Sequence, residues 1–290
     1  MTLAAPALAR SDALVAWRGW RGRPRVVVIT TLLLLGGIVM IMPILFMLST
    51  SLKTGAEIYD LRLIPREPTL ENYVALFKNR RFVDWFVNSL VIATASTVSV
   101  VFFDGLVGYT LCKFRFRGRG LVFVAILSTL MIPTEMLVIP WYLMARQLGW
   151  LNTWWGIMFP GMISAFGVFL LRQFFETVPD DFIDAARIDG LNEFEIWWHV
   201  AMPLVTPAMS ALAIFNFLGN WTAFLWPLIA VTDGKLFTLP VGLASFAGEF
   251  QTEWQVIMTG ASVATIPTLL VFILFQRFIV RGVMLSGLKG

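Results

Sequence analysis

The sequence predicts an all-α membrane protein with six transmembrane helices. Apolar residues make up 58% of the chain and charged residues 14%, and the mean hydropathy is +0.78. These values lie far from the averages of soluble domains. Six apolar runs are long enough to cross the roughly 30 Å hydrocarbon core of a bilayer. The runs cover approximately residues 26–48, 89–111, 121–143, 154–171, 208–231 and 256–279.

The first run is too long for the apolar region of a cleavable signal peptide and lacks a small-residue cleavage site, so we expect it to remain as a helix. Prolines inside the runs predict kinks, because each removes a helical hydrogen bond that neighbouring groups must replace. We expect one six-helix domain over residues 26–280, an N-terminal segment over residues 1–25 and a C-terminal tail over residues 281–290. The prolines are Pro43, Pro133, Pro140, Pro160 and Pro267.

Six spans place both termini on the same side of the membrane. With the N-terminus inside, most lysines and arginines fall on the cytoplasmic side, as the positive-inside rule requires. We therefore expect a multi-pass protein with both termini in the cytoplasm. The basic pI of about 9.5 follows from this topology and from attraction to anionic lipid, and it gives no reason to expect a nucleic-acid partner.

A polar loop over residues 176–207 separates the fourth run from the fifth. Pro179 suits the start of a helix, and Asp180 and Asp181 follow where the helix dipole favours negative charge. Gly190 can end that helix in a left-handed conformation. The pattern predicts a short helix followed by a glycine hinge.

A second helix is expected directly after the hinge. Asn192 and Glu195 have the spacing of a capping box. Pro203 must interrupt this second helix, and Thr206 with Pro207 supplies a cap and a first-turn proline for the fifth span. The loop is thus tied to the membrane at both ends.

The same loop breaks the basic pattern of the other cytoplasmic segments, because its acidic residues far outnumber its arginines. A helix that lies on a membrane usually carries Lys and Arg toward anionic headgroups. Acidic residues instead favour a protein partner. Ala185, Ala186 and Gly190 are small, so the first helix could press closely into a cleft on that partner. The alternative is an ordinary amphipathic loop.

The spacing of this loop resembles the signature of permease subunits of binding-protein-dependent ABC importers, which runs Glu-Ala-Ala, glycine, then a hydrophobic residue and Leu-Pro. Here an aspartate replaces the glutamate, and Val200 and Met202 stand at the hydrophobic positions. Other segments, such as residues 114–118, look like the carbohydrate-uptake (maltose-type) branch, and the resemblance covers nearly the whole chain. The positions carried over for ATPase coupling are Asp184, Ala185, Ala186, Asp189, Gly190 and Pro203.

The resemblance implies a type I ABC importer permease fold with a cytoplasmic coupling-helix loop between helices 4 and 5. The chain would form half of a translocation pore for a sugar or related polyol in a bacterial inner membrane, and would couple to the ATPase through residues 184–203. The implied partners are a second homologous permease subunit, a dimeric ATP-binding subunit that holds ATP and Mg, and an extracytoplasmic solute-binding protein. Within the family, the alternative solutes are glycerol phosphate, peptides and amino acids.

The chain itself is not expected to be an enzyme. It has no glycine-rich Lys-Ser/Thr phosphate loop, so another subunit must hydrolyse ATP. Its one cysteine, Cys112, and one histidine, His199, leave no internal disulfide, zinc cluster or serine-type triad. We therefore expect no catalytic residue, no metal and no cofactor in this chain.

Polar residues at membrane depth predict the solute path, because they are costly unless they face the bundle interior or water. Asn216 and Asn220 lie one helical turn apart near the middle of the fifth run, beside Trp221, the one deep tryptophan. The alternative is that these side chains only bond or pack against neighbouring helices. In the family an asparagine and an acidic residue often follow this tryptophan, whereas Thr222 and Ala223 stand here, so no substrate preference is carried over.

Asp104 and Glu135 are the two acidic residues within the apolar runs. Each is a candidate functional residue by default, and pairing with an arginine of a neighbouring subunit is the alternative. In a carrier of a different class, driven by an ion or proton gradient, they would be the coupling carboxylates. The sequence shows no inverted repeat that supports such a carrier.

Overall fold

The computed structural model describes residues 24–247 and 253–287, and its elements there are all helical. Three helices are long and apolar enough to cross a membrane, and three bent helix pairs raise the number of spans to six if each pair is one span. The predicted all-α fold is confirmed. Most of the predicted terminal segments, residues 1–23 and 288–290, lie outside the described residues. The chain divides into two compact units, residues 1–70 and residues 71–290.

The first unit contains the first span, α2 (Pro24–Ser51), which has Pro43 in its interior. Most of the apolar side chains described on this helix are exposed. An exposed apolar surface of this size requires lipid or another helix to cover it. A short 3-10 helix, η1 (Gly55–Tyr59), follows α2.

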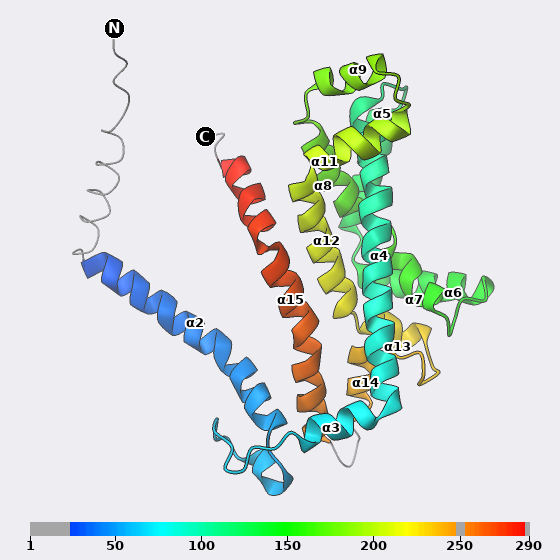
Figure 1. Ribbon diagram of the computed structural model, residues 1–290. Helices are drawn as coiled ribbons and strands as arrows, with labels where there is room; N and C mark the ends of the chain where they lie inside the picture. Colours follow the sequence, from blue (N-terminus) through cyan, green and yellow to red (C-terminus); the bar gives the residue numbers. More distant parts are fainter. Residues whose placement is uncertain (1–23, 248–252, 288–290) are drawn as a thin grey trace. The chain divides into compact units, whose positions relative to one another are not determined.

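The second unit is built around α4 (Arg80–Lys113), which runs along its length (Figure 1). Two helices pack most extensively against α4, and the last helix packs mainly against one of these two. Gly108 permits α8 (Ala165–Phe175) to approach α4 closely, because a Cβ at this position would lie 3.0 Å from the backbone nitrogen of Arg172. The packed helices are α8 (Ala165–Phe175), α12 (Thr206–Trp221) and α15 (Trp254–Gly287). Shorter helices near the ends of α4 and α15 are α3 (Glu71–Lys78) and α14 (Leu239–Ala244).

The third predicted span is broken into two halves that meet at an angle of 96°. The break follows Ile132 and begins at Pro133, which has no backbone N–H and disfavours a helical conformation in the residue before it. The predicted kink at Pro133 is therefore confirmed, and it is a complete break in the helix. The pieces are α5 (Arg119–Ser128), η2 (Thr129–Met131), η3 (Thr134–Leu137) and α6 (Val138–Gln147).

The fourth span is bent by 45°, and the buried carboxylate of Asp104 caps its second half. Both Asp104 oxygens accept from the Ser164 backbone N–H at 3.1 Å, and Oδ2 also accepts from the Ser164 hydroxyl at 2.8 Å. That hydroxyl in turn accepts from the backbone N–H of Gly167. Asp104 is thus bonded within its own chain rather than to an arginine. The pieces of the span are α7 (Trp154–Met158), η4 (Phe159–Gly161) and α8.

The fifth predicted span is shorter than expected. A helix was predicted through residue 231, but α12 ends at Trp221, and a separate short helix, α13 (Leu225–Ala230), follows. The Trp226 indole N–H donates to the carbonyl oxygen of Gly156 at 3.0 Å. This bond fixes α13 against α7, so α13 is a separate helix rather than a continuation of α12.

We predict that replacing Asp104 with alanine destabilises the folded protein. The substitution removes the acceptor of the Ser164 N–H, and a buried group without its partner costs about 1–3 kcal/mol. The measurement is the thermal unfolding midpoint of the purified membrane protein in detergent, which should fall.

Two further variants control this experiment. Asp104→Asn keeps an oxygen acceptor and should lose less stability than Asp104→Ala. Glu135→Ala removes an exposed carboxylate and should change the midpoint little. Equal midpoints for Asp104→Ala and Glu135→Ala would contradict the capping role.

Candidate functional site

The 176–207 loop forms a helical module at one end of the second unit (Figure 1). Its first helix, α9, starts directly after Pro179 with two aspartates in its first turn, as the sequence predicts. The following pieces run almost without interruption, and an 85° bend separates them from α12. The elements are α9 (Asp180–Ile188), α10 (Glu193–Ile196), the π-helix η5 (Trp197–Ala201) and α11 (Met202–Leu204).

Gly190 ends α9 in the left-handed conformation that was predicted, with a φ of +88°. The Gly190 N–H donates to the carbonyl oxygen of Arg187, and the Leu191 N–H donates to that of Ala186, both at 3.1 Å. These two bonds form a Schellman motif, which satisfies carbonyl groups at the end of a helix. The hinge therefore has one defined geometry.

The predicted capping box at Asn192 is also confirmed. The Asn192 side chain accepts from the backbone N–H groups of Phe194 and Glu195 at 3.1 and 3.0 Å, and the Glu195 carboxylate accepts from the Asn192 N–H at 2.9 Å. This reciprocal arrangement satisfies three N–H groups at the start of α10. The chain direction after the hinge is thus set by local contacts.

Pro203 acts differently from the prediction. The helix does not stop there but widens into the π-helix η5 just before it, continues through α11 and bends at Val205. Proline cannot donate a backbone hydrogen bond, and a π turn is one way for a helix to accommodate this loss. The Thr206 hydroxyl donates to the carbonyl oxygen of Pro203 at 2.7 Å, so the predicted Thr206 cap is wrong. Pro207 does lie in the first turn of α12.

α9 has one face toward its own chain and one face toward solvent. Ile183 and Ala186 are 1% and 6% exposed and join an apolar cluster with Trp197. On the opposite face Ala185 is exposed and Ile188 is 86% exposed. The small size of Ala186 therefore serves packing within this chain, whereas Ala185 is accessible to a partner. The other exposed residues of this module include Phe182, Asp184, Asp189 and Gly190.

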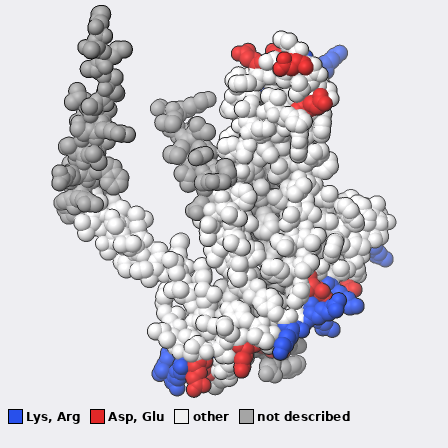
Figure 2. Space-filling model, in the orientation of Figure 1, with Lys and Arg blue, Asp and Glu red and all other residues white. Residues whose placement is uncertain are grey.

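Charged side chains brace α9 against α10. The Arg187 guanidinium contacts carboxylate oxygens of both Asp184 and Glu193 at 2.8 Å. The pKa of Arg187 is raised, mainly by the hydrogen bond to Glu193. The α9 end displays several further carboxylates, which Figure 2 shows as red atoms over this module. The exposed face thus combines apolar side chains with a surplus of negative charge.

The predicted path residues lie on α12, and the structure places them in two different environments. Asn216 accepts from the Thr97 hydroxyl of α4 at 3.3 Å and from the Asn220 amide at 3.0 Å, and both asparagines are half-buried. Trp221 is 3% exposed and donates to the carbonyl oxygen of Ala264 on α15 at 3.0 Å. The asparagines therefore keep an accessible surface, whereas Trp221 is packed inside the helix bundle.

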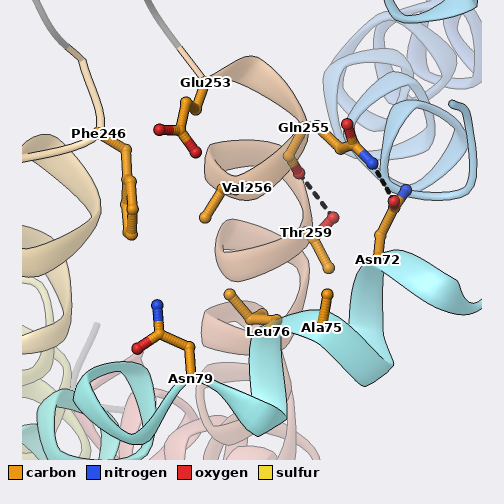
Figure 3. Close-up of a pocket in the computed structure, with 9 residues that line it drawn as sticks. All are labelled: Asn72, Ala75, Leu76, Asn79, Phe246, Glu253, Gln255, Val256 and Thr259. Atoms are coloured by element: carbon orange, nitrogen blue, oxygen red, sulfur yellow. Dashed lines mark hydrogen bonds between the residues drawn. The ribbon is translucent and has the colours of Figure 1, made fainter. Parts of the chain in front are cut away.

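A cavity of about 250 Å³ was not predicted from the sequence (Figure 3). It lies between α3 and α15, where the side chains of Asn72 and Gln255 point toward each other and are hydrogen bonded. The partners come from segments far apart in the sequence, and no local pattern marks them. Figure 1 places this cavity at the opposite end of the unit from α9, so it is separate from the loop module. Its walls also include Asn79, Glu253 and Thr259.

Residues 8–285 match one protein family, which is described as "Binding-protein-dependent transport system inner membrane component". The arabinooligosaccharides transport system permease protein AraQ of Bacillus subtilis is 32% identical, over 91% of this chain and 96% of that protein. The diacetylchitobiose uptake system permease protein NgcG of Streptomyces coelicolor is 31% identical, over 87% of this chain and 85% of that protein. The sn-glycerol-3-phosphate transport system permease protein UgpE of Brucella abortus is 34% identical, over 87% and 93% of the two chains.

A solved structure has the same fold. One chain of a bacterial ABC transporter involved in the import of the acidic polysaccharide alginate matches with a TM-score of 0.80 at 24% sequence identity. The match covers 95% of this chain and all of that chain. The predicted permease fold is therefore confirmed, and the family match extends over nearly the whole sequence. This chain belongs to the family of binding-protein-dependent transport system inner membrane components.

Proposed function

We propose that this chain is a permease subunit of an ATP-driven ABC importer and forms half of a translocation pore. The observation that carries the proposal is the acidic module of α9 and α10, held in one geometry by Gly190 and Asn192 at one end of the helix bundle. A helix with exposed apolar side chains, surrounded by negative charge that a basic partner can complement, is suited to docking on a protein. The partner proposed for this surface is a dimeric ATPase subunit that binds ATP and Mg.

The α9 end of the bundle is proposed to face the cytoplasm. At this end Lys113 is the last residue of α4, Arg119 is the first residue of α5, and Arg115 and Arg117 lie between the two helices. Their positive charge agrees with the positive-inside rule. This orientation puts both termini in the cytoplasm and the cavity between α3 and α15 on the extracytoplasmic side.

The remaining partners follow from the family and from the surface of the chain. The family description supports an extracytoplasmic solute-binding protein as the component that delivers solute. The exposed apolar faces of the spans support a second homologous permease subunit, with lipid covering the rest. Catalysis of ATP hydrolysis is assigned to the ATPase, because this sequence has no phosphate-binding loop.

The proposed solute is a sugar or related polyol. Relatives with about one third sequence identity are described as transporting arabinooligosaccharides and diacetylchitobiose, and another transports sn-glycerol-3-phosphate. Near the middle of α12 the half-buried polar groups are the neutral amides of Asn216 and Asn220. Amides both donate and accept hydrogen bonds, as sugar hydroxyls require, and carry no charge for a phosphate group. This chemistry favours the sugar over glycerol phosphate.

The two acidic residues give little support to an ion-coupled carrier. The carboxylate of Asp104 is fully buried and already accepts from both the N–H and the hydroxyl of Ser164. Glu135 is exposed at the break in the third span. A coupling carboxylate must reach the transported ion, and Asp104 is occupied as a helix cap.

The energy source is the first test of this function. We predict that uptake into proteoliposomes requires ATP, the ATPase, the second permease and the binding protein together, and that adding the transported sugar stimulates ATP hydrolysis. Screening sugars and sn-glycerol 3-phosphate by this stimulation identifies the solute. Uptake by this chain alone under a proton or sodium gradient would overturn the proposal.

The docking surface gives a second prediction. Ala185→Trp should leave the spans inserted but lower uptake roughly tenfold, because overpacking a close interface costs about 1–3 kcal/mol. Ala185→Ser is the matched control and should transport normally. Ala186→Trp should instead lower the amount of folded protein, because Ala186 is buried within the chain. Normal coupled transport by Ala185→Trp, with the complex assembled, would exclude tight docking at this residue.

A third prediction separates the solute path from the packing of the bundle. Asn220→Ala should lower solute uptake or change the choice of sugar, while assembly and basal ATP hydrolysis persist. Trp221→Ala should lower the unfolding midpoint, because removing a buried tryptophan typically costs about 3–5 kcal/mol. If Asn220→Ala only reduces assembly, without a selective change in transport, Asn220 is a packing residue.

A further inference from the structure

Lys113, the last residue of α4, holds the start of α9 with two hydrogen bonds. Its ammonium nitrogen lies 2.6 Å from the carbonyl oxygen of Val178 and 2.7 Å from Oδ1 of Asp180. The Lys113 side chain is 7% exposed, whereas that of Asp180 is 75% exposed. A buried ammonium group is costly unless it is paired and hydrogen bonded, so its position is closely determined.

The attachment is electrostatic as well as geometric. Lys113 donates the hydrogen bond that is the main cause of the lowered pKa of Asp180. Asp180 also occupies the first turn of α9, where a negative charge is favourable. The cation at the end of α4 is similarly favoured by the dipole of that helix. Both helix ends therefore support the ion pair.

α9 also makes apolar contacts, because its buried Ile183 and Ala186 share an apolar cluster with Tyr109 of α4. α9 packs mainly against α10 and η5, and Arg187 bridges α9 to α10. Among the described residues, both hydrogen bonds from α4 to the segment that begins α9 come from Lys113. The Arg119 guanidinium donates to the carbonyl oxygens of Cys112 and Phe114, which fixes the backbone on both sides of Lys113.

α4 connects this attachment to the proposed solute path. The Thr97 hydroxyl on α4 bonds to Asn216 on α12, and Thr97 lies sixteen residues before Lys113, or about 24 Å along a helix. α8 also packs along α4. A displacement of α9 that pulls on Lys113 therefore acts on the helix that contacts the path.

We propose that Lys113 is a positioning residue that transmits the movement of α9 to α4 and so couples ATP hydrolysis to the opening of the solute path. This inference rests on the proposed importer function. A residue with only a structural role would change uptake and ATP hydrolysis in proportion to the amount of assembled complex. Lys113 should instead change the ratio of solute moved to ATP hydrolysed.

The test measures this ratio in proteoliposomes that contain the complete complex. Coupling between two sites typically corresponds to a factor of about 5–150, so we expect Lys113→Met to lower the ratio roughly tenfold. Asp180→Asn loses the ion pair but keeps the bond to Val178, and should lower the ratio less. Lys113→Arg keeps the cation and should retain most of the coupling.

Arg117→Met is the matched control, because it removes one positive charge at the same end of the bundle from an exposed residue. Its ratio should equal that of the wild type. The proposal is overturned if Lys113→Met keeps the wild-type ratio, or if Arg117→Met lowers the ratio as much as Lys113→Met. If Lys113→Met does not assemble, Asp180→Asn decides the question. Absence of ATP-dependent uptake by the wild-type complex would instead reject the importer function itself.

Discussion

A helix that breaks inside a bilayer must find partners for its freed backbone groups within the protein, because hydrocarbon supplies none. This constraint governs the second unit, since two of its spans, the third and the fourth, are bent helix pairs. At the fourth span a carboxylate from another helix supplies the partner, through Asp104 and Ser164. At the break in the third span the Thr129 hydroxyl donates to the carbonyl oxygen of Ile126.

Contacts of this kind make α4 the helix to which the other parts of the second unit are bonded. It caps α8 through Asp104, contacts α12 through Thr97 and holds α9 through Lys113. Near its other end, Trp85 and Asn88 donate to carbonyl oxygens of Gly234 and Lys235, which fixes the loop that leads to α14. One helix thus connects the module proposed to dock on the ATPase with the opposite end of the second unit.

The parts that could be predicted from the sequence are those in which neighbours along the chain determine the geometry. Gly190 and the pair Asn192 and Glu195 act within a few residues, and the structure agrees with both predictions. The breaks in the spans were less visible, because hydropathy records the length of an apolar run but not its direction. The role of Asp104 was hidden because Ser164 lies sixty residues away. The orientation of Ala186 was available from its three-residue spacing to Ile183, which marks one face of a helix.

The contacts within the α9 and α10 module join residues that are close in the sequence, whereas the bonds from α4 to other helices join distant ones. Its caps and the bond from Arg187 to Glu193 join residues at most six positions apart. The bonds from Lys113 to Val178 and from Asp104 to Ser164 close loops of 65 and 60 residues. Local contacts form faster because they lose less chain entropy on closure. We therefore expect the hinge at Gly190 to form early during folding, before α4 packs against α8. The helices of the bundle would then pack beside a turn that is already formed.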